Sequence, residues 1–317
     1  MINQLTTRPK VSILIPVFNR KDYIRECIQS ALDQTFADFE VVVVDNASDD
    51  GTWETCQKFA ASDGRVRIYR NKTNIGPVRN WMRCAQEAKG SLSKILFSDD
   101  TLEPDCLSEM VPKLNDPNIA LVFCAARVGR SKEDSIILYS HANSSGLNIK
   151  QFLNLVLNGR APLSPGAALI RTPDLLKNLH LSFPTSTPRK FENNGAGPDV
   201  MILLLTAQAY PAVACVESPL VYFRAHSGSL TIKNSSNDVA QGYHSAIAWF
   251  LVKNCPKQAW FSYVANSWLK SMRFAKNWRD PSAHLKEFEG RGDSGEVILL
   301  QAFAFVEMVK FIFRRKI

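Results

Sequence analysis

Two adjacent carboxylates, Asp99 and Asp100, follow a short apolar run in the sequence. The run Ile95-Leu96-Phe97 predicts a buried strand, and open α/β folds bind their ligands at the carboxyl ends of such strands. Two acids this close repel each other unless a cation lies beside them. Mg²⁺ and Mn²⁺ bind one or two carboxylates together with substrate phosphates, so the pair indicates a metal and phosphate site. The alternative is a solvated Asp-Asp turn.

The composition is that of a globular protein with anionic partners. The 317 residues, 45% of them hydrophobic, allow one large domain or one domain with an extension. Lys and Arg number 38 against 30 Asp and Glu, and the net charge of +8 favours anions. Charge alone does not choose among nucleotide phosphates, phospholipid head groups and nucleic acid.

The cysteines and the N-terminal residues predict a reducing compartment. Seven cysteines without a CxxC pair argue against a disulfide framework and against a zinc site. Residues 1–10 are polar and lack the apolar core of a signal peptide. We therefore expect a cytoplasmic protein.

Apolar runs alternate with amphipathic segments through the first half of the chain. The run Phe39–Asp45 is almost wholly apolar, as is typical of parallel strands buried on both faces. The alternation predicts an α/β fold with a doubly wound, mostly parallel sheet. The expected strands cover residues 11–16, 39–45, 66–69 and 94–97, and the expected helices cover residues 21–33, 53–61 and 78–88.

Polar side chains gather where three of these strands end. The segment Pro16–Asn19 follows the first strand, Asp45 ends the second, and Asp99-Asp100 follows the fourth. The carboxyl ends of parallel strands line one crevice. The sequence has no glycine-rich dinucleotide or P-loop motif. A nucleotide here would be held by carboxylates and by a metal on its diphosphate. For Asp45 the alternative is a turn-forming or helix-capping role.

Four segments together resemble the family 2 inverting glycosyltransferases, which have the GT-A fold. They cover about the first 110 residues and have the order and spacing of that family: residues 11–19, 43–52, 74–80 and 97–105. The resemblance implies a GT-A domain with a C-terminal helical extension. It also implies a nucleoside-diphosphate-sugar donor, with a UDP-sugar the first expectation, and an Mn²⁺ or Mg²⁺ cofactor.

The resemblance also implies a role for individual residues. Asp100 and His226 are expected at the metal, and Asp99 is expected to face the ribose. Where the family often has a third acid, this chain has Phe97 and Ser98, which leaves the division of labour between Asp99 and Asp100 open. The remaining residues expected to bind the nucleotide-sugar are Pro16, Val17, Phe18, Asn19, Asp45, Asn74 and Arg79.

Asp199 is the candidate general base. It follows a loop rich in Pro, Gly and Asn and lies at the start of a helix expected over residues 200–209. An inverting transfer needs a carboxylate that takes the proton of the acceptor hydroxyl, and the family has an acid at the matching position. This chain has Pro198 where the family often has a second acid. The alternative role is that of a first-turn or N-cap acid.

Helices are expected beyond residue 237. The segment 296–317 has a broad apolar face and ends in basic residues, which suits a helix in a membrane interface. Packing on the catalytic domain or on a second subunit, as in a homo-oligomer, is the alternative. We expect a nucleotide-sugar-binding half at residues 1–125, an acceptor half at residues 126–236 and a helical extension at residues 237–317.

The sequence thus predicts a metal-dependent glycosyltransferase. Its expected acceptor is a growing glycan or a lipid-linked acceptor of a bacterial surface polysaccharide, such as lipopolysaccharide or capsule, at the inner face of the cytoplasmic membrane. No nucleic-acid partner is predicted. One rival is a sugar-phosphate nucleotidyltransferase, but its glycine-rich phosphate loop is missing after the first strand. The other is a non-catalytic membrane-surface adaptor, which the retained acids argue against.

Overall fold

The computed structural model describes residues 8–141, 146–185, 189–226, 228, 236–274, 280–288, 290 and 292–314, without the side chains of 236–237, 270–274 and 306–314. The chain divides into two compact units. The first comprises Met1–Leu181 and Glu192–Ser235, and the second comprises Ser182–Phe191 and Ser236–Ile317. The three-part division expected from the sequence stays a prediction.

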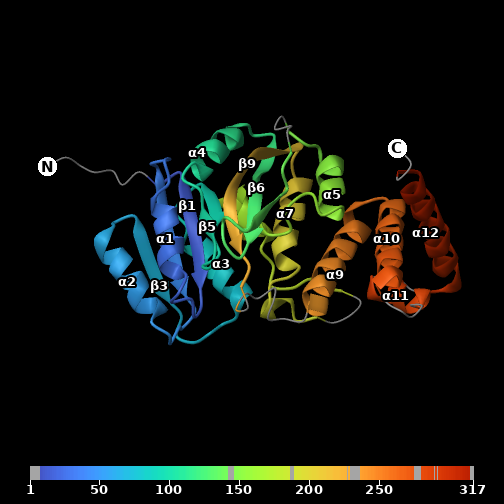
Figure 1. Ribbon diagram of the computed structural model, residues 1–317, viewed down its shortest axis with the longest axis horizontal. Helices are drawn as coiled ribbons and strands as arrows, with labels where there is room; N and C mark the ends of the chain where they lie inside the picture. Colours follow the sequence, from blue (N-terminus) through green and yellow to red (C-terminus); the bar gives the residue numbers. More distant parts are fainter. Residues whose placement is uncertain are drawn as a thin grey trace. The chain divides into compact units, whose positions relative to one another are not determined.

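The first unit is built on one mixed sheet with the strand order β3-β2-β1-β4-β8-β6-β9-β5, to which β7 is added beside β6 (Figure 1). Strands β1 to β4 run parallel, while β8 is antiparallel to both β4 and β6. The predicted α/β fold with a mostly parallel first half is confirmed. The strands are β1 (Val11–Val17), β2 (Phe39–Asp45), β3 (Val66–Arg70), β4 (Leu92–Ile95), β5 (Thr101–Leu102), β6 (Ile119–Gly129), β7 (Ser135–Leu138), β8 (Ala168–Arg171) and β9 (Ala212–Arg224).

Every residue of β1 and β2 is buried, because helices cover both faces of the parallel strands. Alternate residues of β1, such as Ile13 and Ile15, pack with apolar side chains of α1 (Ile24–Leu32) and α2 (Thr52–Ser62). Since successive side chains of a strand point to opposite faces, Leu14 faces the other side of the sheet. Helix α3 (Pro77–Glu87) packs against β1 and β2 there.

The fourth strand differs from the prediction. Strand β4 ends at Ile95, and residues 97–100 form a turn in which the Asp100 amide donates to the Phe97 carbonyl at 2.9 Å. The Phe97 ring packs on Trp81, with the ring centroids 5.3 Å apart. The short strand β5 then pairs with β9. The two acids therefore lie in a turn between two strands of the sheet.

The rest of the first unit contains short helices and the strand β8. The 3-10 helix η2 (Pro165–Ala167) leads directly into β8. The remaining helices are α4 (Cys106–Met110), η1 (Val111–Asn115), α5 (Ile149–Leu157), α6 (Thr172–Asn178), η3 (Phe191–Asn193) and α7 (Pro198–Gln208).

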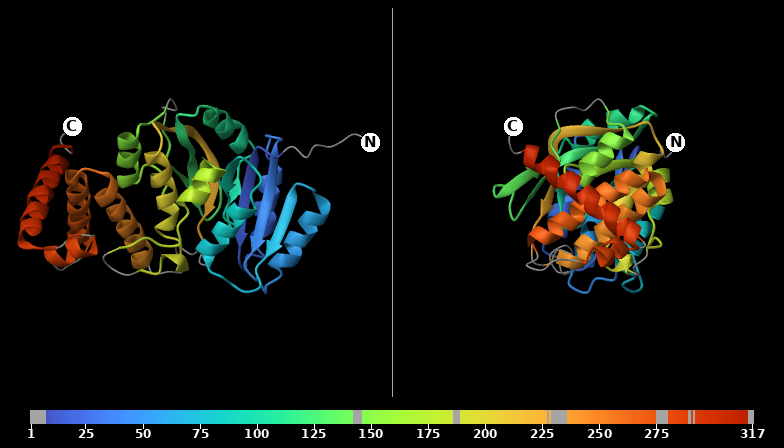
Figure 2. Two further views of the ribbon diagram at one scale, coloured as in Figure 1. Left: turned by 180° about the vertical axis from the view of Figure 1, so that it is seen from behind. Right: turned by 90° about the vertical axis from the view of Figure 1, so that its right-hand side faces the viewer.

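The second unit is helical, as predicted for the C-terminal part. Its helices are α9 (Ser236–Asn254), α10 (Lys257–Phe274), α11 (Pro281–Glu287), which was not predicted, and α12 (Ser294–Arg314). Helices α10 and α12 lie side by side (Figure 2), and the rings of Phe261 and Phe303 stack between them at 5.6 Å.

Helix α12 is apolar on its outer side as well. Its side chain Leu300 is buried, whereas Ile298 and Phe305 are 65% and 62% exposed. Among the described residues, no helix is long and apolar enough to cross a membrane. Of the terminal basic residues Arg314, Arg315 and Lys316, the last two lie outside the described residues, so the predicted membrane role of these charges remains a prediction.

Candidate active site

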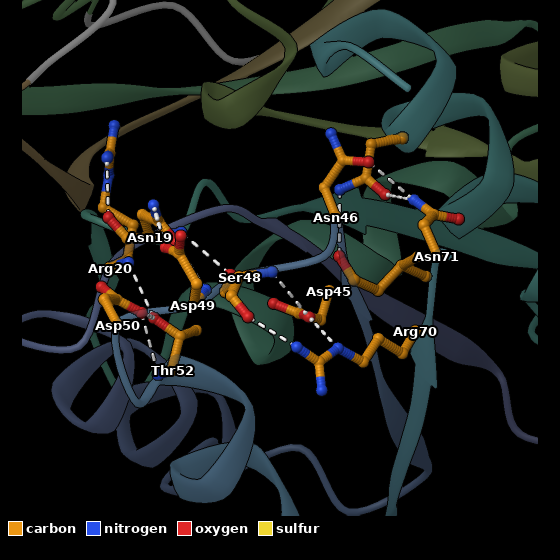
Figure 3. Close-up of polar contacts among 12 residues, drawn as sticks. Asn19, Arg20, Asp45, Asn46, Ser48, Asp49, Asp50, Thr52, Arg70 and Asn71 are labelled. Carbon is orange, nitrogen blue, oxygen red and sulfur yellow. Dashed lines mark hydrogen bonds and ion pairs between the residues drawn. The ribbon is translucent and has the colours of Figure 1, made fainter. Parts of the chain in front are cut away.

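The loops that follow β1 and β2 are locked to each other (Figure 3). The Asn19 side chain donates to Asp49 Oδ1 at 2.9 Å and accepts from the Asp49 amide at 3.1 Å. The Asn19 amide donates to Ser48 Oγ at 2.9 Å, and the Asn19 backbone has a φ of 49°. Asparagine tolerates this left-handed conformation better than most residues. The side chain of Asn19, which was predicted to bind the nucleotide, thus holds the two loops together.

Asp45 is fully buried at the end of β2. Its Oδ2 accepts from the Ser48 amide at 3.1 Å and lies 3.1 Å from Arg70 Nε. Its Oδ1 is buried and accepts a hydrogen bond from no described residue. The bond to Ser48 is the local contact of a turn-forming aspartate, but that role leaves one carboxylate oxygen unused. An unpaired buried acceptor costs about 1–3 kcal/mol, and more when it is charged.

Arg70 is a residue that the sequence did not reveal as part of this site. It ends β3 directly opposite Asp45 in the register of β2 and β3. Its guanidinium also donates to the Ser48 carbonyl at 2.6 Å (Figure 3). It lies 5.3 Å from the centre of the Trp53 ring. Arg70 therefore ties β3 to the loop after β2 and balances the Asp45 charge.

Asn74 and Arg79, both predicted to bind the nucleotide-sugar, are already engaged by protein groups. The Asn74 Oδ1 accepts from Asn46 Nδ2 at 2.8 Å and from the Gly76 amide at 2.9 Å. Arg79 Nη2 lies 3.4 Å from Glu192 Oε2, with both side chains nearly half exposed. Asn74 thus holds the loop before α3, while Arg79 forms a surface ion pair.

Asp99 has two basic neighbours. Its Oδ2 lies 2.9 Å from His226 Nε2 and 3.4 Å from Arg20 Nε. Arg20 directly follows Asn19, and its amide donates to Thr52 Oγ1 at 2.8 Å. The structure thus brings together the loop after β1, the turn that contains Asp99 and Asp100, hereafter the acid turn, and the segment that contains His226. Arg20, like Arg70, was not predicted as a site residue.

Asp100 is the more deeply buried of the two acids, and the residue is 8% exposed. Its Oδ1 accepts from the Arg224 amide at 3.0 Å. Burial, followed by the neighbouring Asp99 carboxylate, raises the pKa of Asp100 well above its usual range. The Arg224 side chain donates to the Asp99 carbonyl at 3.1 Å and to Glu26 Oε2 at 2.6 Å. Arg224 therefore fixes the acid turn against the end of β9.

The Asp99-Asp100 turn offers hard carboxylate oxygens, the ligands that Mn²⁺ and Mg²⁺ prefer, while the His226 imidazole is hydrogen-bonded to Asp99. No cluster of three or more His, Cys, Asp or Glu able to hold a metal forms among the described residues. Oxygens of a bound diphosphate would complete the coordination.

Asp199 is buried in the first turn of α7. Its Oδ1 accepts from the Gly197 amide at 2.9 Å and from the Val200 amide at 2.7 Å. The carboxylate therefore caps its own helix, as the alternative role required. This geometry also fixes its orientation. Whether Asp199 acts as a base stays a prediction.

The chain matches the model described as "Glycosyl transferase family 2" over residues 12–177. It is 32% identical over 117 residues to the putative glycosyltransferase EpsH of Bacillus subtilis (strain 168), which covers 37% of this chain and 33% of that protein. It is 40% identical over 123 residues to the chondroitin synthase of Pasteurella multocida (strain Pm70), which covers 38% of this chain and 12% of that protein. The chain thus spans about a third or less of the length of these relatives.

The fold resembles that of S. aureus TarS. The crystal structure of TarS 1–349 in complex with UDP matches with a TM-score of 0.65 at 16% identity, covering 97% of this chain and 92% of that one. The complex of TarS 1–349 with UDP-GlcNAc matches with a TM-score of 0.63 at 16% identity, over 93% and 88%. This likeness confirms the predicted GT-A fold. Because the family model covers more than half of the chain, the protein belongs to glycosyl transferase family 2.

Proposed function

We propose that this protein transfers a sugar from a nucleoside-diphosphate sugar to an acceptor hydroxyl with inversion at the anomeric carbon. One observation carries the proposal. Asp45, a buried carboxylate with an unpaired oxygen, and the Asp99-Asp100 turn are joined through the interlocked loops that contain Asn19 and Arg20. The base of a nucleoside diphosphate would bind at Asp45, and its diphosphate would bind at the Asp99-Asp100 turn.

The base end of the donor is assigned to Asp45. Its Oδ1 can only accept, so the matching base is one with a ring N–H on its pairing edge, such as uracil or guanine. Because this oxygen is covered in the structure, the base reaches it when a neighbouring group shifts. Arg70, whose side chain is 40% exposed, is the adjacent group that has room to move. The UDP and UDP-GlcNAc complexes of TarS support a uridine donor.

The diphosphate end is assigned to the acid turn. Asp100 and Asp99, with His226, would hold an Mn²⁺ or Mg²⁺ ion, which when bound supplies positive charge to the departing diphosphate. The Arg20 guanidinium lies beside Asp99 and adds a positive charge at the same place. The structure of the mannosyltransferase PcManGT from Pyrobaculum calidifontis with GDP-Man and Mn²⁺, matched at a TM-score of 0.50, supports a metal-bound donor.

The acceptor side is assigned to Asp199. Its carboxylate takes the proton of the acceptor hydroxyl while the oxygen forms a bond to the anomeric carbon. The bond from that carbon to the diphosphate breaks at the same time, so the configuration inverts and a nucleoside diphosphate leaves. The proposed acceptor is a growing glycan or a lipid-linked glycan of a bacterial surface polysaccharide. The relatives named for EpsH and for chondroitin synthesis support a glycan acceptor.

A peripheral membrane contact through α12 suits a lipid-linked acceptor. The exposed side chains Ile298, Leu299 and Phe305 form an apolar outer side on this helix. Such a side, next to a basic chain end, binds anionic membrane interfaces. The proposed location is therefore the inner face of the cytoplasmic membrane.

The experiment is a donor panel with the parent protein and Asp45→Ala. UDP-, GDP- and TDP-sugars with Mn²⁺ are incubated with the protein, and the release of nucleoside diphosphate is scored. Asp45→Ala should weaken nucleotide binding by about 1–3 kcal/mol, the cost of a hydrogen bond to a charged group, without changing metal dependence. Pyrophosphate produced from nucleoside triphosphate and sugar phosphate would instead indicate the nucleotidyltransferase. Absence of turnover and of nucleotide binding would indicate the adaptor.

A further inference from the structure

One aromatic side chain joins the acid turn to the loop before Asp199. Trp81, on α3, is 6% exposed. On one side its ring lies 5.3 Å from the Phe97 ring, centre to centre. On the other side it lies against Gly195, where an added Cβ would meet Trp81 Cη2 at 2.0 Å. All three residues belong to the first compact unit.

Each neighbour of Trp81 is bonded to a residue of the proposed chemistry. The Phe97 carbonyl accepts from the Asp100 amide at 2.9 Å. The Gly195 carbonyl accepts from the Asp199 amide at 3.3 Å. The indole therefore lies between the backbone that holds the acid turn and the backbone that holds the start of α7.

Gly195 is the residue that allows this close packing. Its φ of +76° is unfavourable for residues with a side chain, and a Cβ would overlap the indole ring. A further contact between α3 and this loop is the ion pair of Arg79 and Glu192, at 3.4 Å and nearly half exposed. Surface ion pairs contribute about 0–1 kcal/mol. The buried indole is thus the stronger link.

We propose that Trp81 is a positioning residue that sets the place of the Asp199 carboxylate relative to the acid turn and so to the donor. This inference rests on the proposed role of Asp199. A shift of about 1 Å between reacting groups can cost about 100-fold in rate. Removing the indole leaves a space into which the Gly195 loop can move.

The test compares Trp81→Leu and Trp81→Phe with Phe152→Leu. Phe152 is fully buried in the same unit and packs on Phe123, and neither ring contacts Trp81 or Gly195, so it is a control for the loss of a buried ring. Trp81→Leu should lower kcat by about 10- to 100-fold and leave nucleotide affinity within about twofold of the parent. Trp81→Phe, which keeps a ring, should recover part of the rate. A kcat loss no larger than that of Phe152→Leu, or an equal loss of nucleotide affinity, would overturn the proposal.

Two further measurements separate this proposal from that of the base. In an Asp199→Asn background, Trp81→Leu should have little further effect on kcat, because both changes act through one group. If Asp199→Asn keeps the parent rate, the base assignment fails by itself. Amide hydrogen exchange needs no substrate: Trp81→Leu should speed exchange at Gly197 and Val200, whose amides bind Asp199. Unchanged exchange there, relative to the control, would contradict the positioning role even if no donor supports turnover.

Discussion

Replacing Asp199 by Asn should remove most of the activity and little of the stability. Asparagine keeps the Oδ1 that accepts from Gly197 and Val200, at 2.9 and 2.7 Å in the parent. It loses the negative charge at the helix N-terminus, worth about 0.3–1 kcal/mol, and it loses the ability to take a proton. A positioned general base contributes about 10²–10⁴-fold. At 1.36 kcal/mol per decade, the barrier should rise by about 2.7–5.4 kcal/mol.

The companion variant Asp199→Ala separates capping from catalysis. Alanine loses both amide hydrogen bonds, so it should cost a further ~0.5–2 kcal/mol of stability, as the loss of a helix cap does. Its kcat should nevertheless match that of Asp199→Asn. Steady-state release of nucleoside diphosphate at saturating donor and acceptor measures kcat, calorimetry with nucleotide measures donor affinity, and thermal unfolding measures stability.

The reasoning fails if Asp199→Asn transfers sugar at near the parent rate. The base would then lie elsewhere, and Glu192 in the same loop is the next candidate. Its carboxylate is paired with Arg79 at 3.4 Å. A fall in donor affinity equal to the fall in kcat would also refute the assignment, because an acceptor-side base should not bind the nucleotide.

Three further predictions follow from other parts of the chain. Asp100→Ala should abolish metal-dependent nucleotide binding with the fold intact, and unchanged affinity in a metal titration by calorimetry would move the metal to Asp99. Burial raises the pKa of Glu40, but hydrogen bonds from Ser12 and Arg67 outweigh it and hold this pKa below its ordinary 4.5. Ionised Glu40 therefore contributes its full stability above pH 4.5, and this contribution is lost as the pH falls through the lower pKa of the folded state. In Glu40→Gln the free energy of unfolding, measured by denaturant titration, should fall less steeply with acid. Cutting the chain before residue 296 should reduce flotation with anionic vesicles while nucleotide affinity survives; an insoluble product would favour a purely packing role for α12.

The sequence predicted those strands and helices whose position depends mainly on their own residues. Strands β1 and β2 were placed well because their apolar runs are continuous. Strand β4 begins and ends two residues earlier than predicted, because the apolar run continues through Leu96 and Phe97 beyond the strand. Helix α11 was missed because it is short, although Asp280 at its N-cap and Pro281 in its first turn favour a helix start.

The site was predicted in outline, and its missing residues share one physical cause. The acids at the strand ends could be found locally, but the partners of those acids come from other strands. Arg70 pairs with Asp45 because the register of β2 and β3 places them opposite each other, and Arg20 of the loop after β1 pairs with Asp99 of the acid turn. Lys94, within the fourth predicted strand, is fully buried and donates to the Gly166 carbonyl. A single sequence contains no information on such pairings.

The interlocked loops that contain Asn19 and Asp49 have a consequence for the kinetics of donor binding. Their mutual hydrogen bonds, and that from the Asn19 amide to Ser48, fix the two loops in the protein alone. Loops that are ordered before the ligand arrives lose little conformational freedom when the ligand binds. Donor association should then be governed by diffusion and by the displacement of the Arg70 side chain, a rotamer change, and not by the folding of a loop. A substitution that removes these hydrogen bonds should slow donor association and leave the rate of the chemical step unchanged.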